Sequence, residues 1–223
     1  MTTRLDLRDL CRRRLSDTTG TVYWSDEKVN QWINDAIADY SNHFPYETGY
    51  ELSLTAAVHK YALTSLVKPR SILAVEYPVS QDPLKYLTWR DINDSRGFFD
   101  GDYYYVVGVP PTHIILGPGS WATAAKAQIT YLADHVYPAD DATVTTVPDL
   151  HLELITLFVV TCAMQDVLSV QSQNPAQNSF TIGTLALNMN RASREYMTKM
   201  EEYKATWQEG SKVRKWDDFD RVY

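Results

Sequence analysis

The stretch from Leu150 to Val170, LHLELITLFVVTCAMQDVLSV, is the segment of this 223-residue chain that best predicts its fold. It is long enough for about six turns of helix, and apolar residues lie on most of its sides. Pro148 and Asp149 just before it suit a first helical turn. A helix that is apolar nearly all round must be covered by other elements. We therefore expect a central helix with the rest of a helical core built around it.

The most apolar part of this segment also bears on membranes. It runs from Leu154 to Met164 and is interrupted by Thr156 and Thr161. A stretch of this length is too short to span a bilayer. The N-terminus has no continuous apolar core of the kind that a signal peptide needs. We expect no membrane partner and folding in a reducing cytoplasm.

Three more helices are predicted by apolar residues spaced three and four positions apart. The first runs from about Arg4 to Asp17, and a segment rich in Thr and Gly breaks it. Ser25 suits the N-cap of the second helix, and Pro45 ends it. The last helix is long, from about Thr184 to Glu209, and Gly210 suits its C-terminal cap.

The middle of the chain has a strand pattern instead. Short runs rich in Tyr, Val, Ile and Thr are separated by Gly, Pro, Asp and Asn. Gly108–Pro111 fits the connection of a hairpin, whereas Leu84–Asn93 fits either a helical turn or a connection. Short strands with little helix favour a small sandwich or barrel. The predicted strands are Tyr50–Thr55, Lys60–Leu63, Ser71–Tyr77, Tyr103–Val107, His113–Leu116 and Gln128–Ala133.

The order of these elements predicts an α+β fold. Its parts are an α-helical bundle core formed by the N- and C-terminal helices, an inserted small antiparallel β domain and an extended C-terminal arm. We expect N-terminal helices in residues 1–47 and the β domain in 48–147. The C-terminal helices are expected in 148–210 and the arm in 211–223.

Composition excludes some classes of function. The formal net charge is −7 at pH 7, whereas a non-specific nucleic-acid binder is normally basic. The 15 Tyr and 6 Trp residues fit the surfaces of a sandwich and subunit interfaces equally well. Cys11 and Cys162 are too far apart to indicate a disulfide framework or a zinc site. We interpret both as small buried apolar residues.

The sequence carries no persuasive catalytic signature. It has no nucleophile elbow, P-loop, H-E-x-x-H or G-x-G-x-x-G motif. His135 could be drawn as a metal cluster with Asp134, Asp140 and Asp141, but a solvated acidic loop is the better interpretation. We therefore predict no catalytic residue, no cofactor and no metal, and regard an enzyme as the weaker hypothesis.

Two features indicate contacts with other proteins. Arg4, Arg8 and Arg12 lie four residues apart on one side of the first predicted helix. They form either a solvated face or a basic face that meets a neighbouring subunit.

The second feature is the tail, which is too short to bury its aromatic residues against itself. It either folds back or inserts into a neighbour, and we favour the neighbour. Its contact residues would be Lys212, Arg214, Lys215, Trp216, Phe219, Arg221 and Tyr223.

Several segments carry a family resemblance. The opening has RRRL (Arg12–Leu15), then YWSDE (Tyr23–Glu27) leading into the helix VNQWINDA (Val29–Ala36). The middle has VGVPP (Val107–Pro111), followed by HIILGP and AQITY, and two helices close the chain. Taken together, the chain resembles head–tail connector (adaptor) proteins of tailed double-stranded DNA phages. The resemblance covers most of the chain, but Gly117–Gly119 departs from the family's usual P-x-P.

The resemblance implies a structural role in the virion neck. Such subunits form a homo-oligomeric ring of about twelve copies under the portal protein, although they often stay monomeric until they meet it. The ring extends the channel through which genomic DNA passes without specific binding, and it offers a surface to the tail or to a stopper protein. By position, Lys212–Tyr223 matches the arm that reaches onto the portal. The acidic balance fits a channel wall to which DNA does not adhere.

Two alternatives stay open. The chain could be a tail-completion or stopper protein on the tail side of the neck. It could also bind glycans through exposed aromatics of the β domain, with Trp89 and Trp121 as the residues to test. Deletion of the arm separates the first alternative from an adaptor, because only an adaptor needs the arm to bind the portal.

Overall fold

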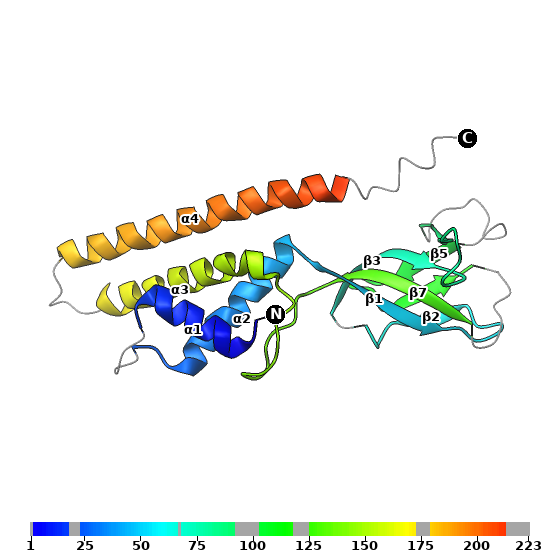
Figure 1. Ribbon diagram of the computed structural model, residues 1–223, viewed down its shortest axis with the longest axis horizontal. Coiled ribbons are helices and arrows are strands. Elements are labelled where there is room, and N and C mark those ends of the chain that lie inside the picture. Colours follow the sequence, from blue (N-terminus) through cyan, green and yellow to red (C-terminus); the bar gives the residue numbers. More distant parts are fainter. Residues whose placement is uncertain are drawn as a thin grey trace. The chain divides into compact units, whose positions relative to one another are not determined.

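A computed structural model describes residues 2–17, 23–66, 68–91, 103–117, 125–172 and 179–212. The chain divides into two compact units. The helical unit comprises Met1–Phe44 and His135–Tyr223, and the β unit is Pro45–Asp134. Figure 1 shows helices in the first unit and strands in the second, which agrees with the predicted α+β class.

The first two helices begin at residues that satisfy their free backbone groups. Helix α1 is Arg4–Leu15, and the side chains of Thr3 and Asp6 form a reciprocal capping box at its start. Helix α2 is Asp26–His43, and the hydroxyl of Ser25 accepts a hydrogen bond from Lys28 N at 3.3 Å. The helix starts predicted from sequence lie within two residues of these positions.

Helix α3 is Leu152–Ser172, preceded by the 3₁₀ turn η1 at Asp149–His151. It lies between helix α4, Ser179–Lys212, and the pair formed by α1 and α2, and it contacts all three (Figure 1). The prediction of a central helix is therefore confirmed. The buried core around it comprises Leu7, Cys11, Val29, Trp32, Ile33, Ala36, Ile37, Tyr40, Phe44, Val147, Leu152, Leu154, Ile155, Val159, Ala163 and Met200.

Within the described part of the chain, Asp149–Val170 is the one segment long and apolar enough to cross a membrane by length and composition. The central helix of a globular protein meets the same criterion. Leu154, Leu157 and Val159 are at most 1% exposed and pack inside the helical unit. The segment thus has a packing role within the fold.

The β unit consists of two sheets. One has the order β1-β7-β3 and the other β2-β6-β5-β4. All pairs of strands are antiparallel except the short parallel pair β4–β5. Alternate residues of β7 face the core, since Ala127, Ile129, Tyr131 and Ala133 are buried. The strands are β1 Tyr46–Ser53, β2 Lys60–Ala62, β3 Pro69–Glu76, β4 Thr88–Trp89, β5 Tyr103–Val107, β6 His113–Leu116 and β7 Lys126–Ala133.

Some boundaries differ from the sequence prediction. Strand β1 begins at Tyr46, because its first residue pairs with Ala133 at the end of β7. Of the ambiguous segment Leu84–Asn93, residues 84–91 are described: Leu87 N donates to Val75 O of β3 at 2.8 Å, and the next two residues form β4. The predicted hairpin joins β5 to β6, which confirms that connection.

Residues 135–147 group with the helical unit, although the sequence favoured the β domain. His135 N donates to Ser41 Oγ at 3.0 Å, and the imidazole Nε2 lies 2.8 Å from the carbonyl oxygen of Phe44. Farther along, Arg4 N donates to Thr143 O at 3.2 Å, and Val147 is buried in the helical core. These contacts with distant residues hold the segment against α1 and α2.

Candidate interaction surfaces

The predicted basic face of α1 is largely buried inside the subunit. The side chains of Arg8 and Arg12 are only 9% and 10% exposed. Arg12 donates to Asp17 and to Asp26 at 2.5 Å each, and to the carbonyl oxygen of Trp24 at 2.9 Å. Because Asp17 is itself only 5% exposed, Arg12 and Asp17 form a buried ion pair at the C-terminal end of α1.

Arg8 and Arg4 meet at one carboxylate. Arg8 makes a bidentate contact with Asp141 at 3.1 and 3.0 Å, and Arg4 Nε donates to the same side chain at 2.9 Å. The hydrogen bond from Arg8, followed by the one from Arg4, lowers the pKa of Asp141. The described partners of Arg4, Arg8 and Arg12 thus belong to the same chain. A contact of this face with a neighbouring subunit stays a prediction.

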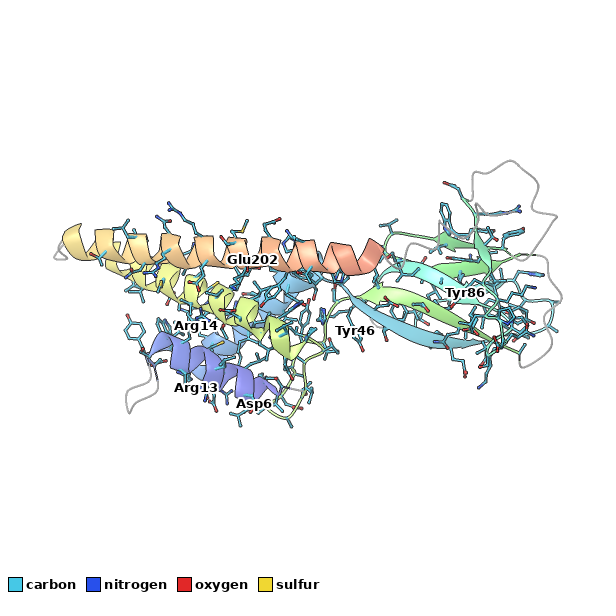
Figure 2. The ribbon with its side chains drawn as sticks, turned by 45° about the horizontal axis from the view of Figure 1, so that its top comes forward. Asp6, Arg13, Arg14, Tyr46, Tyr86 and Glu202 are labelled. Carbon is cyan, nitrogen blue, oxygen red and sulfur yellow. The ribbon has the colours of Figure 1, made fainter. Side chains whose placement is uncertain are left out.

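Other charged residues of α1 have different surroundings. Figure 2 labels Asp6, Arg13 and Arg14 along this helix. Arg14 lies 3.2 Å from Glu195 of α4 and 3.7 Å from Glu153 of α3, so it ties three helices together. Arg13 is exposed and has no ion pair with another described residue.

Helix α4 has one packed face. Ala192 and Met200 are 8% and 1% exposed, and they point toward α3. The Tyr196 hydroxyl donates to Asp39 of α2, and burial first and this contact second raise the pKa of Tyr196. These residues recur at steps of four, as one side of a helix requires.

The opposite side of α4 has no cover among the described residues. Its members are spaced three or four apart and all are exposed. Leu187 is 70% exposed, and Met197 beside this face is 55% exposed. Figure 2 labels Glu202, the residue next to Glu201 of this face, on the helix. The outer face of α4 comprises Leu187, Arg191, Arg194, Thr198, Glu201 and Ala205.

The charges of α4 differ in whether they are compensated. Glu201 pairs with Lys204 at 3.0 Å, and Glu202 pairs with Lys199 at 3.3 Å, both within the helix. Arg191 and Arg194 have no hydrogen bond or ion pair with any other described residue. The outer face of α4 therefore presents two uncompensated guanidinium groups. The sequence reasoning missed them, although their i, i+3 spacing on a predicted helix was a usable signal.

The C-terminal end of α4 is anchored before the predicted arm begins. The Tyr203 hydroxyl donates to Leu150 O at 3.2 Å, and its ring centroid lies 4.4 Å from that of His151. The Trp207 ring packs edge-on against Phe44. Burial lowers the pKa of His151, whose Nδ1 lies 2.5 Å from a tyrosine hydroxyl of α2.

The arm itself is mostly outside the described residues. Lys212 is the last described residue and ends α4, so the helix continues two residues beyond the predicted boundary. The other predicted contact residues lie beyond it and are not placed: Arg214, Lys215, Trp216, Phe219, Arg221 and Tyr223. Their contact with a portal stays a prediction.

The glycan-binding alternative rests on two tryptophans of the β unit. Trp89 lies in β4 and is 58% exposed. Trp121 lies outside the described residues. The structure therefore places one of the two residues at an exposed position, and the alternative stays untested.

The residues considered for metal binding have other roles. In the described ranges, no group of three His, Cys, Asp or Glu side chains could hold a metal ion. The ring nitrogens of His135 lie 2.9 Å from Thr146 Oγ1 and 2.8 Å from a backbone carbonyl oxygen. Asp140 accepts hydrogen bonds from the Thr143 hydroxyl and then from the backbone of Thr143 and Ala142, which lower its pKa and close a turn. Cys11, which the sequence predicted to be a small buried residue, is buried, and this burial raises the pKa of its thiol to about 12.

Comparison with known families covers almost the whole molecule. A family model matches residues 2–209, which include both units and nearly all of α4. The match places the chain in the class of head–tail adaptors, which are structural proteins of the phage neck. The chain belongs to the SU10 adaptor protein family. The predicted resemblance to head–tail connector proteins is thereby confirmed.

Among solved structures, a chain from "Neck of empty GTA particle computed with C6 symmetry" is similar at 15% sequence identity with a TM-score of 0.27. The similarity covers 68% of this chain and 74% of that one. A search of curated proteins finds no match.

Proposed function

We propose that this chain is the head-to-tail adaptor subunit that forms a ring of about twelve copies under the portal protein. The ring extends the channel for genomic DNA and presents a surface to which the tail or a stopper protein attaches. The subunit is made in the host cytoplasm and acts in the neck of the virion. The observation that carries this proposal is the adaptor-family match over residues 2–209.

The exposed side of α4 supports assembly with other proteins. Leu187 and Met197 are 70% and 55% exposed in the isolated chain. Subunit interfaces are enriched in aromatic residues and methionine, and their centres are apolar. A long helix that keeps such residues at its surface is suited to contacts that form only after assembly.

The arm after α4 is the proposed contact with the portal. Because α4 is braced against the core as far as Trp207, the arm begins from a fixed point of the subunit. Trp216, Phe219 and Tyr223 serve as anchors in this proposal, since interface energy concentrates in a few buried aromatic residues. The basic residues around them add contacts to acidic groups.

Channel function fits the net charge of −7. An acidic ring lowers the affinity of the channel wall for DNA, because binding to the phosphate backbone is driven mainly by Lys and Arg. Retention of DNA by the isolated ring at moderate salt would contradict this part of the proposal.

Mass photometry with the portal protein of the same phage tests the arm. The full chain should add a ring of copies to the portal, and a chain that stops after Lys212 should add none. A matched variant with Trp216, Phe219 and Tyr223 all replaced by alanine keeps length and charge, and it should behave like the truncation.

The same experiment separates the alternatives. Portal binding that survives loss of the arm would favour a tail-completion or stopper protein. Absence of portal binding by the full chain would contradict the adaptor proposal. Glycan-array binding that is lost on Trp89→Ala would then favour the glycan-binding alternative.

A further inference from the structure

A closed ring of identical subunits joins two different surfaces of each copy. In such a head-to-tail interface, one face of a subunit meets another face of its neighbour. In the helical unit, α3 is central, α4 covers it on one side and α1 with α2 on the other (Figure 1). The outer face of α4 and the outer face of α1–α2 are therefore candidates for the two joined surfaces.

The α4 side is locally basic. Glu201 and Glu202 are already paired with lysines one turn away, and Glu195 is paired with Arg14 of α1. Arg191 and Arg194 are exposed and have no partner in the described part of the chain. The charge left for a second protein to neutralise is thus positive.

The α1–α2 side is locally acidic. Glu27 and Asp35 both lie on the exposed side of α2, eight residues and therefore about 12 Å apart along the helix axis. Asp9 is exposed on α1. The side chains of these three carboxylates have no ion pair or hydrogen bond with another described residue. Among the described cations of α1 and α2, Arg13 alone likewise has no ion pair.

Each copy of the chain carries a net charge of −7, so the copies repel one another when they associate. Association of like-charged subunits is favoured when oppositely charged patches meet locally. The uncompensated cations of α4 and the uncompensated carboxylates of α1–α2 meet this requirement in a second copy of the same chain. No other molecule is needed to supply the complementary charge.

Building on the proposed ring, we propose that the outer face of α4 docks on the α1–α2 face of the next copy. Arg191 and Arg194 of one subunit lie against the carboxylates Glu27 and Asp35 of its neighbour. Asp9 borders this contact, and Leu187 covers apolar surface beside it. The basic face Arg4, Arg8 and Arg12 is internal to the subunit in this arrangement.

Charge reversal on each face tests the contact. Arg191→Glu with Arg194→Glu reverses the α4 face, and Glu27→Lys with Asp35→Lys reverses the α2 face. Each double variant, mixed with portal protein, should need at least about tenfold more chain for half-maximal ring formation in mass photometry. A chain with all four substitutions should recover rings, and so should an equal mixture of the two double variants, because each reversed face then finds a complementary partner.

A matched control checks net charge. Lys60 is exposed in β2, and Lys60→Glu changes the charge of the chain as much as Arg194→Glu does. Ring formation should survive the first change and weaken with the second. An equal loss with both would attribute the effect to net charge and overturn the proposal. Thermal unfolding of each variant should match the parent chain, because all these side chains lie on the surface.

The outcomes separate this contact from the adaptor function. Normal rings from both double variants would overturn the α4 contact and leave the adaptor function intact. If the double variants lose ring formation and neither their mixture nor the fourfold variant regains it, the α4 contact is also overturned, because charge pairing would then not explain the loss. A parent chain that forms no ring with its portal would contradict the adaptor function, and the contact with it.

Discussion

Helices α1 and α4 both carry arginines at helical spacing, but they use them in opposite ways. On α1, Arg8 and Arg12 are at most 10% exposed and hold carboxylates of the same chain. On α4, Arg191 and Arg194 are exposed and hold no described partner. The comparison teaches that a row of basic residues indicates a contact surface only when its charges are left uncompensated by the subunit itself.

The difference originates in the acids around each helix. Asp17, Asp26 and Asp141 reach α1 from the turn after it, from the next helix and from a segment far along the chain. On α4, Glu201 and Glu202 pair with lysines of the same helix, and Glu195 pairs with Arg14 of α1. The α1 arginines therefore stabilise the fold, and the α4 arginines remain available for assembly.

The largest expected effect on stability comes from Arg12. Arg12→Ala leaves Asp17 buried without its partner, and breaking a buried ion pair in this way costs about 3–5 kcal/mol. Urea denaturation should show this loss in the free energy of unfolding. Arg13→Ala on the same helix is the control and should change it by less than about 0.5 kcal/mol. A loss below about 1 kcal/mol for Arg12→Ala would contradict the buried pairing.

Arg8 should have an intermediate effect. Its bidentate contact with Asp141 joins α1 to the segment after β7, but Asp141 is 48% exposed, so solvent screens the pair. We expect Arg8→Ala to lower the free energy of unfolding by less than Arg12→Ala does and by more than Arg13→Ala does. Combining it with Asp141→Asn should be less than additive, because both changes remove one interaction. Full additivity would show that the two side chains act independently.

A smaller effect should appear with pH. The arginines lower the pKa of Asp141, so its folded value lies below the ordinary value of about 3.9. The stability from this carboxylate is therefore complete above the ordinary value, and it is lost as pH falls through the lowered pKa. Unfolding measured between pH 5 and 2 should show this loss in the parent chain. Arg8→Ala should reduce it, and an unchanged pH dependence would contradict the assignment.

The smallest effect on stability is expected on α4. Arg191→Ala and Arg194→Ala should each change the free energy of unfolding by less than about 0.5 kcal/mol, since both side chains lie on the surface without partners. Denaturation of the isolated chain checks this. A destabilisation comparable with that of Arg8→Ala would mean that α4 uses its arginines as α1 does, and the comparison would fail.

Much of the fold followed from local patterns. The apolar segment at Leu150–Val170 predicted the central position of α3, and Ser25 marked the start of α2. These signals lie within a few residues of the structure they specify. The strand pattern similarly located the hairpin between β5 and β6.

Other features depend on partners distant in sequence. Arg8 meets Asp141 from 133 residues away, which no helical spacing reveals. Strand β4 is two residues long, and its position depends on neighbours in β3 and β5. The sequence located the arginines of α1 but could not show that they are buried. The sequence did not single out Arg191 and Arg194, because only the structure shows which acidic residues of α4 are already paired with other cations.

The pairing of Tyr46 with Ala133 has a consequence for how the chain reaches its native state. The helical core must join α1 and α2 to α3 across the whole inserted β unit, and closing a loop of that length in an unfolded chain carries an entropy cost. Once β1 and β7 have paired, they deliver Phe44 and His135 as near neighbours. The cost of bringing the two halves of the helical core together then falls by about 2–3 kcal/mol. Early folding of the insertion would thus accelerate formation of the helical core, so slow pairing of β1 with β7 would delay both units.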